Sequence, residues 1–312
     1  MGSTPRTAFL LQIHQNPNQV NLFIKQLIAE DQADVFVHID RKCDPALKKE
    51  IISHPNVTIL QESIECEWGD ISQVDVTILL LQEVLATNKL YDFVCLRSGQ
   101  DLLVNSSFKT FLQCNQGKVF MTYRLLRRNE LGLMKINWLK FARRRYTTLH
   151  PFRLFRRLLI SLYRKGINLF PNFHQWPSNY SFYKGSQWFT IPLETARYII
   201  NFLNENTWYY QYFTNTLVPD ESFFQTLIMN SPYKETVVNN NLYFLKWGET
   251  VSERNSPQIL TKHDISNIKK SNQFFARKFD ELEDYAVIQY FAETTSLKST
   301  SKLELAEIGV KC

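Results

Sequence analysis

Two adjacent carboxylates, Asp220 and Glu221, are the residues whose types and surroundings best suit catalysis. They lie in LVPDESFFQTL (217–227), where proline fixes its own φ and favours an extended conformation for Val218. We expect Asp220 to be the N-cap of a short helix, with Glu221 in its first turn. A carboxylate there lies at the positive end of the helix dipole on a rigid mount, which suits a general base that deprotonates a hydroxyl. First-turn acids are more often simple helix stabilisers, so further evidence has to come from the rest of the chain.

Polar residues also follow three apolar runs that are typical of buried strands, at 7–14, 33–40 and 91–96. Strands that alternate with helices predict right-handed βαβ units and a mostly parallel sheet. Ligands of such sheets bind at the carboxyl ends of the strands. The polar residues at these ends are His14, His38, Asp40 and the run from Ser98 to Asp101. Each alone suits a turn or a cap, but three sets at one edge favour a binding site.

The other expected elements follow from periodicity and turn residues. Helices are expected after a cap at 16–21, at 70–88, at 193–204 and at 281–291, and further strands at 56–60, after the turn 184–186, and at 241–247. The fold class is therefore α/β, with a mostly parallel central sheet flanked by helices. We divide the chain into an α/β half (1–120), a basic helical insert (121–180), a second half of the same domain (181–293) and a tail (294–312).

The five cysteines are Cys43, Cys66, Cys95, Cys114 and Cys312. They are widely spaced and form no CxxC or Cys/His cluster, which predicts a reduced compartment and no zinc site. The sequence has no signal peptide and no apolar run of about eighteen residues, so an intracellular protein is expected unless an anchor is missing.

The net charge of +6 comes from one region. Residues 121–170 contain thirteen Lys and Arg but a single acid, Glu130. Arginines surround the apolar face of the helix expected near 152–164, which suits the surface of an anionic membrane. A helix packed on the domain with solvated arginines is an equal alternative. Nucleic acid is not expected as a partner, because no RNA- or DNA-binding motif accompanies the charge.

The order of the motifs resembles glycosyltransferase family 14, the Core-2/I-branching β-1,6-N-acetylglucosaminyltransferases and peptide-O-xylosyltransferases. The matching pieces are FLLQIHQ, VFVHIDRK, EWGDISQVDVTILLLQEVL, YDFVCLRSGQDLLV, YKGSQWFTI, VPDESFFQTL, YFLKWGE, SPQILTKHDI and FFARKFD. Most are weak individually, but their joint order is specific and covers about 7–120 and 180–291. The resemblance implies a GT-A-type fold and inverting transfer of a sugar from a UDP donor to an acceptor glycan. GlcNAc is the favoured sugar, with xylose or a hexose as alternatives.

The resemblance also implies roles for individual residues. Glu221 falls on the catalytic base. The expected nucleotide-sugar site contains Ile13, His14, Asp40, Ser98, Asp101, Arg254 and Lys278. In it, Asp40 holds the uridine part and Lys278 the diphosphate, while Arg254 is the nearest match to a partnering arginine that does not align cleanly. The expected acceptor site contains Trp247, Trp188 and Asp220.

Charge stabilisation at the diphosphate is expected to need no metal. Most GT-A enzymes hold a divalent ion with Asp-x-Asp, whereas the corresponding strand end here, Ser98-Gly99-Gln100-Asp101, has one carboxylate. A fixed cation such as Lys278 can take over that role, so we expect no metal and no other cofactor.

Two functions from different classes remain open at this point. The first is an enzyme of bacterial type in the cytoplasm, in peripheral contact with the inner face of the cell membrane through 121–170, which acts on a glycan or a lipid-linked glycan. The second is a non-catalytic sugar-nucleotide or polyanion-binding protein on the same fold.

Overall fold

The computed structural model describes residues 6–29, 33–250 and 256–296, and the structural statements below refer to these residues. Its centre is a seven-stranded sheet in the order β10-β6-β9-β4-β1-β2-β3. The strands are β1 (Thr7–Ile13), β2 (Ala33–Ile39), β3 (Val57–Ile59), β4 (Phe93–Ser98), β6 (Val119–Met121), β9 (Phe189–Pro192) and β10 (Val237–Asn239). Pairing is parallel throughout except at β9, which is antiparallel to β4 and β6. The predicted mostly parallel sheet is confirmed, and strands from both predicted halves join it.

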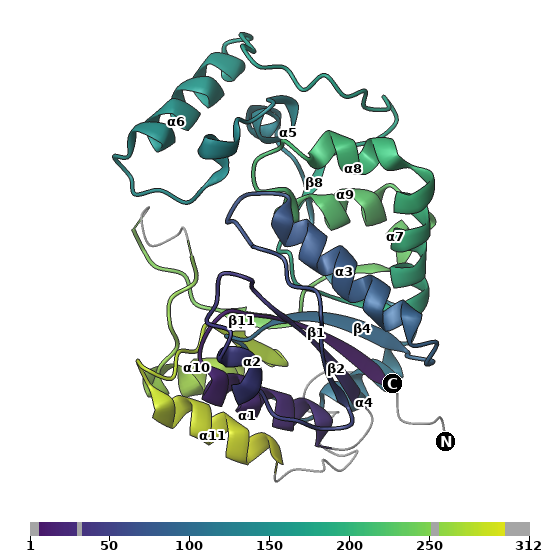
Figure 1. Cartoon of the computed structure of the whole chain (residues 1–312), viewed down its shortest axis with the longest axis vertical. Coiled ribbons are helices and arrows are strands. Elements are labelled where there is room, and N and C mark those ends of the chain that lie inside the picture. The colour runs from purple at the N-terminus through teal and green to yellow at the C-terminus, as the bar shows by residue number, and fades with distance from the viewer. Residues whose placement is uncertain (1–5, 30–32, 251–255, 297–312) are drawn as a thin grey trace.

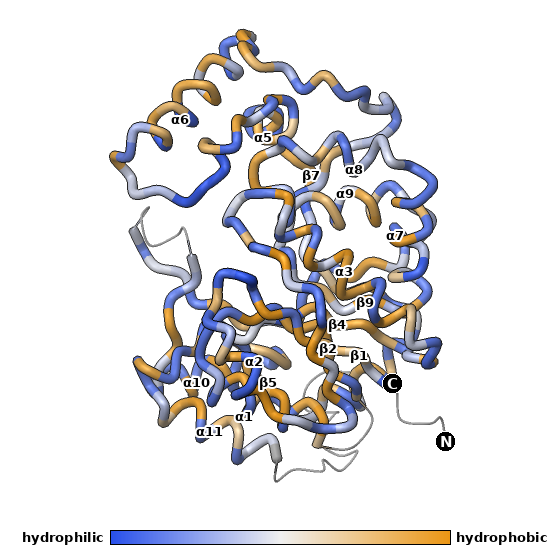
Figure 2. Tube along the Cα trace, viewed as in Figure 1, coloured by the Kyte–Doolittle hydropathy of each residue, from blue (hydrophilic) through white to orange (hydrophobic). Residues whose placement is uncertain are grey.

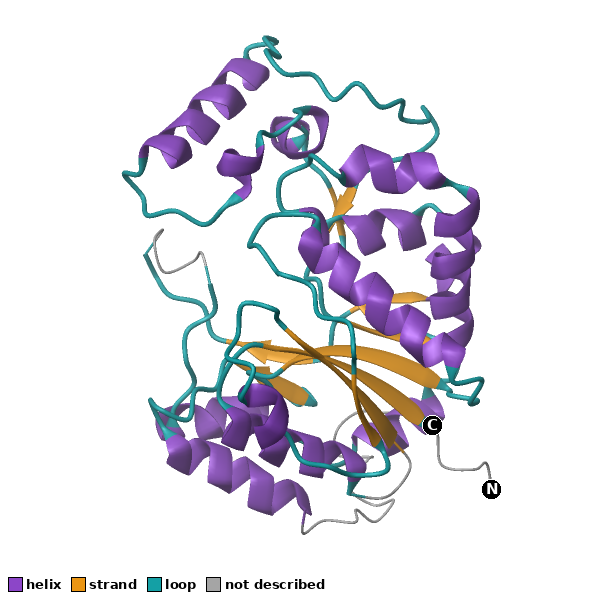
Figure 3. Cartoon of the chain, viewed as in Figure 1, coloured by secondary structure: helices purple, strands orange, loops and turns teal. Residues whose placement is uncertain are grey.

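Alternation along β1 explains why helices cover both faces of this sheet. Ala8 and Leu10 belong to one apolar cluster, whereas Phe9, Leu11 and Ile13 belong to the other. Because both faces of the strand are apolar, both must be buried. One face is covered by α3 (Ser72–Ala86), α7 (Leu193–Glu205), α8 (Thr207–Phe213) and α9 (Phe223–Met229) (Figure 1). The other is covered by α1 (Pro17–Ile28), α2 (Leu47–Glu50), α4 (Phe108–Cys114), α10 (Ile265–Lys270) and α11 (Tyr285–Ser296) (Figure 3).

Two small sheets complete the strands. One has the order β11-β12-β5, from β11 (Tyr243–Leu245), β12 (Phe275–Arg277) and β5 (Leu102–Leu103). The other pairs β7 (Arg124–Leu125) with β8 (Tyr183–Lys184). The β7–β8 pair joins the two ends of the basic insert (121–180), called the basic segment below. The segment therefore leaves and re-enters the domain at one point.

The basic segment folds around a small apolar cluster of its own. It contains the 3-10 helix η1 (Arg128–Glu130), α5 (Gly132–Lys135), the 3-10 helix η2 (Lys140–Arg143) and α6 (Pro151–Arg164). Its cluster consists of Ile136, Trp138, Ala142, Leu159 and Leu217. Leu217 comes from outside the segment and directly precedes the Val-Pro-Asp-Glu motif. The predicted basic helix is confirmed as α6, which lies at the margin of the molecule (Figure 1).

Several expected boundaries and states are corrected by the structure. The strand expected at 241–247 is only β11, and the last helix begins at Tyr285 rather than at 281. Asp284 explains that start, because its Oδ1 accepts hydrogen bonds from the backbone N–H groups of Ala286 and Val287 at 3.1 and 3.3 Å. Cys43, Cys66 and Cys95 are free, whereas Cys114 is disulfide-bonded, a state that the wide spacing of the cysteines did not predict. No helix of the described ranges has the length and apolar character needed to span a membrane.

Candidate active site

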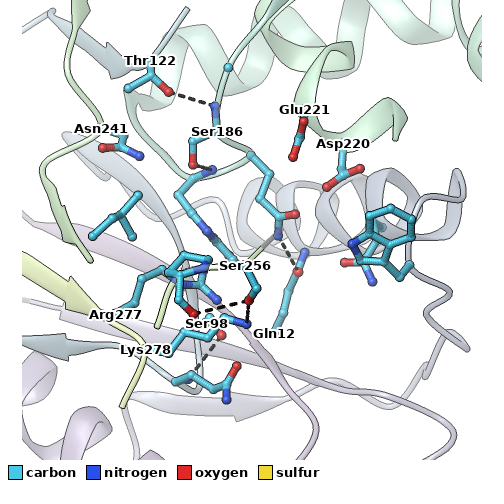
Figure 4. Close-up of a pocket in the computed structure, with 18 of the residues that line it drawn as sticks. Gln12, Ser98, Thr122, Ser186, Asp220, Glu221, Asn241, Ser256, Arg277 and Lys278 are labelled. Atoms are coloured by element: carbon cyan, nitrogen blue, oxygen red, sulfur yellow. Dashed lines mark hydrogen bonds between the residues drawn. The ribbon is translucent and has the colours of Figure 1, made fainter. Parts of the chain in front are cut away.

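A cavity of about 750 Å³ lies where the carboxyl ends of β1, β2 and β4 meet. Ile13 and His14 reach it from β1, His38 and Asp40 from β2, and Ser98 from β4. The parallel register of these strands brings their ends to one edge, as the sequence predicted. The opposite part of the wall includes Asp220 and Glu221, which lie across the cavity from Arg277 and Lys278 (Figure 4).

The carboxylate pair is mounted differently from the prediction. Asp220 and Glu221 lie in a 3-10 turn, η3 (Pro219–Glu221), and α9 begins only at Phe223. Asp220 is therefore not the N-cap of this helix. Val218 is also not extended, because its φ and ψ of 56° and 54° place it in the left-handed region, which costs a β-branched residue free energy.

Tertiary hydrogen bonds hold this unfavourable turn. The N–H of Val218 donates to the carbonyl of Gly69 at 3.1 Å, and the N–H of Leu217 donates to the carbonyl of Leu133 at 3.0 Å. The turn is thus tied both to the loop before α3 and to α5 of the basic segment. Neither contact is visible in the local sequence, which explains why the conformation was missed.

Glu221 is held by the turn Lys184-Gly185-Ser186. Nζ of Lys184 lies 2.8 Å from Oε2 of Glu221, and the N–H of Gly185 donates to the Glu221 carbonyl at 2.8 Å. A Cβ on Gly185 would lie 1.8 Å from the carbonyl oxygen of Thr122, so only glycine fits there. This turn was expected from the sequence, but the contact of Lys184 with Glu221 was not. The glycine at the centre of the turn was the signal for a close backbone contact.

Asp220 is the less accessible member of the pair. Its Oδ1 is buried and accepts no hydrogen bond in the described structure. Burial, and then the negative charge of Glu221, raise the pKa of Asp220 to about 7. Near neutral pH the two carboxyl groups therefore carry fewer than two negative charges between them.

Two cations at the end of β12 form the facing wall. Nζ of Lys278 donates to Oγ of Ser256 at 2.7 Å. Burial, together with the positive charges of Arg277 and Arg145, lowers the pKa of Lys278 to about 8. The guanidinium of Arg277 lies 4.4 Å from the ring centre of Trp188, and its Nη1 is buried without a hydrogen-bond partner in the described structure. An orphaned buried donor on a cavity wall is ready to bind an anion. Lys278 was expected at this site from the motifs, whereas Arg277, the residue directly before it, was not.

Asp101 does not line the cavity and can act on it only through other residues. Its carboxylate is fully buried, and its Oδ2 accepts hydrogen bonds from the N–H of Ser98 at 2.7 Å and from the hydroxyl of Tyr243 at 2.5 Å. Its Oδ1 lies 3.5 Å from Nε of Arg277. Burial raises the pKa of this carboxyl, against the pull of Arg277. We therefore infer that Asp101 holds Arg277 and the end of β4 in place.

At the β2 end of the cavity, the two histidines contribute polar groups but little positive charge. Nε2 of His38 accepts a hydrogen bond from the N–H of Ile64 at 2.8 Å, and burial lowers the pKa of His38 to about 4. Burial also lowers the pKa of His14. Oδ1 of Asp40 accepts from the N–H of Lys42 at 3.0 Å. His38 is therefore a neutral hydrogen-bonding group near neutral pH, and the Lys42 backbone holds the Asp40 carboxylate in place.

Three tryptophans line the same cavity, which gives it faces on which a sugar ring can stack. Trp247 is 51% exposed beyond the end of β11, and Trp188 packs near Arg277. Trp68, 43% exposed, was missed, although it stands in the matched piece EWGDISQ. Arg254, the uncertain partnering arginine, lies outside the described residues.

Comparison with known proteins gives one family and distant relatives. The family model "Branch: Core-2/I-Branching enzyme" matches residues 7–269. A xylosyltransferase of Ciona intestinalis is 25% identical over 91% of this chain and 33% of its own length. Xylosyltransferase oxt of Drosophila melanogaster is 24% identical, and human xylosyltransferase 2 is 23% identical, each over 92% of this chain and 33% of the relative. The chain thus spans about a third of the length of these relatives.

Among solved structures, the apo form of mouse xyloside xylosyltransferase 1 matches with a TM-score of 0.34 and 11% identity. The match covers 75% of this chain and 85% of that one.

Proposed function

Because this chain belongs to the Core-2/I-branching enzyme family, we propose that it is an inverting glycosyltransferase. It would move a sugar from a UDP-sugar to a hydroxyl of an acceptor glycan. GlcNAc is the sugar favoured by the family resemblance, and the relatives named xylosyltransferases add support for xylose. The observation that carries the proposal is the opposition of a carboxylate and fixed cations across one cavity (Figure 4).

In the proposed chemistry, one side of the cavity supplies the base and the opposite side supplies the cations that bind the leaving group. Glu221 takes the proton of the acceptor hydroxyl while the hydroxyl oxygen attacks the anomeric carbon of the donor sugar from the face opposite UDP. The new glycosidic bond forms as the bond from the anomeric carbon to the phosphate oxygen breaks, and its electron pair leaves with UDP. This displacement inverts the anomeric carbon. Lys278 and Arg277 would stabilise the charge that grows on the diphosphate.

Metal-independent catalysis is part of the proposal. The carboxylate of Asp101 already interacts with Ser98, Tyr243 and Arg277, and it does not line the cavity. The chemistry expected of a metal is instead available from the two cations at the end of β12. Trp247, Trp188 and Asp220 would contact the acceptor, and Ile13, His14, Asp40 and Ser98 the nucleotide.

We further propose that the acceptor is a glycan or a lipid-linked glycan and that α6 brings the enzyme to an anionic membrane. The exposed side chains of α6 support this placement, because Leu154, Arg157 and Leu158 all face solvent. The anionic surface that we propose is the inner face of the cell membrane, which the enzyme would reach from the cytoplasm.

The first test is the Glu221→Gln variant, assayed for UDP release and product with a panel of UDP-sugars, including UDP-xylose and UDP-GlcNAc, each with and without EDTA. Loss of the base should lower transfer by roughly 10²–10⁴-fold while UDP still binds. Glu194→Gln is the matched control, because Glu194 is exposed on α7 and lies 3.8 Å from Arg197, away from the cavity. EDTA should leave wild-type transfer unchanged.

The same assay separates the rival outcomes. Near-normal turnover in Glu221→Gln would remove Glu221 as the base, and inhibition by EDTA would replace the Lys278 mechanism with a metal. Binding of a UDP-sugar by the wild type without transfer, and without slow hydrolysis in the absence of acceptor, would favour a non-catalytic binding protein.

A further inference from the structure

Three consecutive arginines of the basic segment have three different surroundings. Nη1 of Arg143 lies 2.6 Å from Oδ1 of Asp70, so this arginine anchors the segment to the loop before α3. Nη2 of Arg144 lies 4.0 Å from Oε1 of Glu67. Arg145 instead lines the cavity that contains Glu221 and Lys278. The segment therefore contributes a side chain to the site, which the pattern of its residues did not indicate.

The backbone that carries Arg145 is held on both sides. On one side is the buried ion pair of Arg143. On the other, the ring of Tyr146 stacks on His150 with centroids 4.1 Å apart, and Nη1 of Arg153 donates to the Tyr146 carbonyl at 3.1 Å. Arg145 thus projects from a fixed mount rather than from a free loop.

The position of Arg145 is at the nucleotide end of the cavity. It also lines an adjoining hollow of about 430 Å³, together with His14, Asp40 and Cys66. His14 and Asp40 follow β1 and β2, where parallel α/β sheets bind their ligands. Arg145 makes no ion pair with any residue in the described part of the chain, whereas the two arginines that precede it do.

The charges around this end call for an anion. Arg145 is close enough to Lys278 for the two positive charges to disfavour each other. Arg277, the third cation, has the buried Asp101 as its counter-charge within the described residues. All three cations line one cavity. Bringing them there costs free energy, which a multiply charged anion between them would recover.

We propose that Arg145 binds the diphosphate of the nucleotide sugar together with Lys278 and Arg277, so that the basic segment closes the donor site. This role rests on the proposed function. Arginine suits it, because its planar guanidinium can donate two parallel hydrogen bonds to phosphate oxygens. The basic segment would then bind the donor substrate in addition to any contact that it makes with a membrane.

The test compares UDP with uridine, which lacks the phosphates, by calorimetric titration of the wild type and of Arg145→Gln. Removing a charge-assisted hydrogen bond to phosphate should weaken UDP binding by roughly 10–100-fold and leave uridine binding unchanged. Arg197→Gln is the matched control, because Arg197 is half-exposed on α7, away from the cavity. A thermal melt of each variant checks that it folds.

Each other outcome has a definite meaning. UDP binding equal to that of the wild type, in a folded variant, would overturn the role of Arg145 alone. Equal losses for UDP and uridine would overturn it as well, because they indicate an interaction with the nucleoside or a structural effect. A wild-type protein that binds neither UDP nor any UDP-sugar would overturn the proposed function and, with it, this inference.

Discussion

Burial, more than pairing, shifts the pKa values of Asp220 and Lys278, which face each other across the cavity (Figure 4). Desolvation raises the pKa of Asp220 and lowers that of Lys278, so both groups lose part of their charge near neutral pH. Glu221 keeps a partner in Lys184 at 2.8 Å, with Asp220 directly beside it in the chain. A bound diphosphate would favour the charged form of Lys278, so donor binding should depend on pH.

This dependence gives the prediction at the residue scale. The pKa of Lys278 is about 8, so the lysine is mostly charged below that pH and mostly neutral above it. UDP affinity should therefore fall as pH rises from about 7 to about 9.5, by up to roughly tenfold per pH unit above the pKa. Lys278→Arg should flatten the profile, because arginine stays charged. Titration calorimetry across this pH range measures the UDP affinity of the wild type and of Lys278→Arg. Identical pH profiles for the two proteins would exclude Lys278 as the titrating group.

At the scale of elements, the position of Glu221 depends on close backbone contacts of the turn 184–186. The turn 184–186 runs against the carbonyl of Thr122 on one side and that of Glu221 on the other. β7 and β8 hold its start, because Arg124 and Lys184 are partners in their register. Glu221 thus takes its position from three segments that are far apart in sequence.

Gly185→Ala tests this arrangement. Its Cβ would overlap the Thr122 carbonyl at 1.8 Å, so the backbone must shift, at a cost of about 1–3 kcal/mol of stability. Transfer should fall further than stability explains, because the shift moves Glu221. Thermal melts and kcat measure the two effects.

Gly132→Ala is the matched control. Its Cβ would lie nearest to the side chain of Tyr163, at 3.1 Å from the ring, and alanine favours the helix α5. This variant should keep normal transfer. A Gly185→Ala variant that also kept a normal kcat would contradict the account of the turn.

For the whole molecule, the basic segment connects the cavity with an exposed surface. Arg145 lies on the cavity wall, while α6 carries Leu154 and Leu158, which are 45% and 55% exposed. Figure 2 shows apolar residues along α6 interrupted by polar ones. A single segment could therefore place the donor site next to an anionic membrane surface.

Flotation with vesicles tests this placement. The protein should bind vesicles of anionic lipid and not those of phosphatidylcholine alone, and salt should weaken the binding. Leu154→Ser with Leu158→Ser should lower the binding at least about tenfold, since each leucine loses burial in the interface. Leu90→Ser is the control, because Leu90 is 85% exposed between α3 and β4. Unchanged flotation of the double variant would remove α6 as the contact.

Much of the site could be predicted, because it depends on where strands end. His14, Asp40 and Ser98 follow apolar runs whose parallel pairing brings their carboxyl ends to one edge. Lys278 and Glu221 followed from the order of the motifs, and both line the cavity. Asp101 had the right position in sequence but faces inward, because a turn residue can point to either side of the backbone.

Apolar runs and periodicity were enough to predict the buried strand β1, the helices α3 and α6 and the wall formed by strand ends, and the order of the motifs was enough to indicate the family. These are local or cumulative properties of the chain. The left-handed Val218, the pairing of Lys184 with Glu221, the buried donor of Arg277 and the arrival of Arg145 became visible only in three dimensions. Each depends on contacts between segments distant in sequence. Such contacts fix a local conformation or a charge that the neighbouring residues alone would not favour.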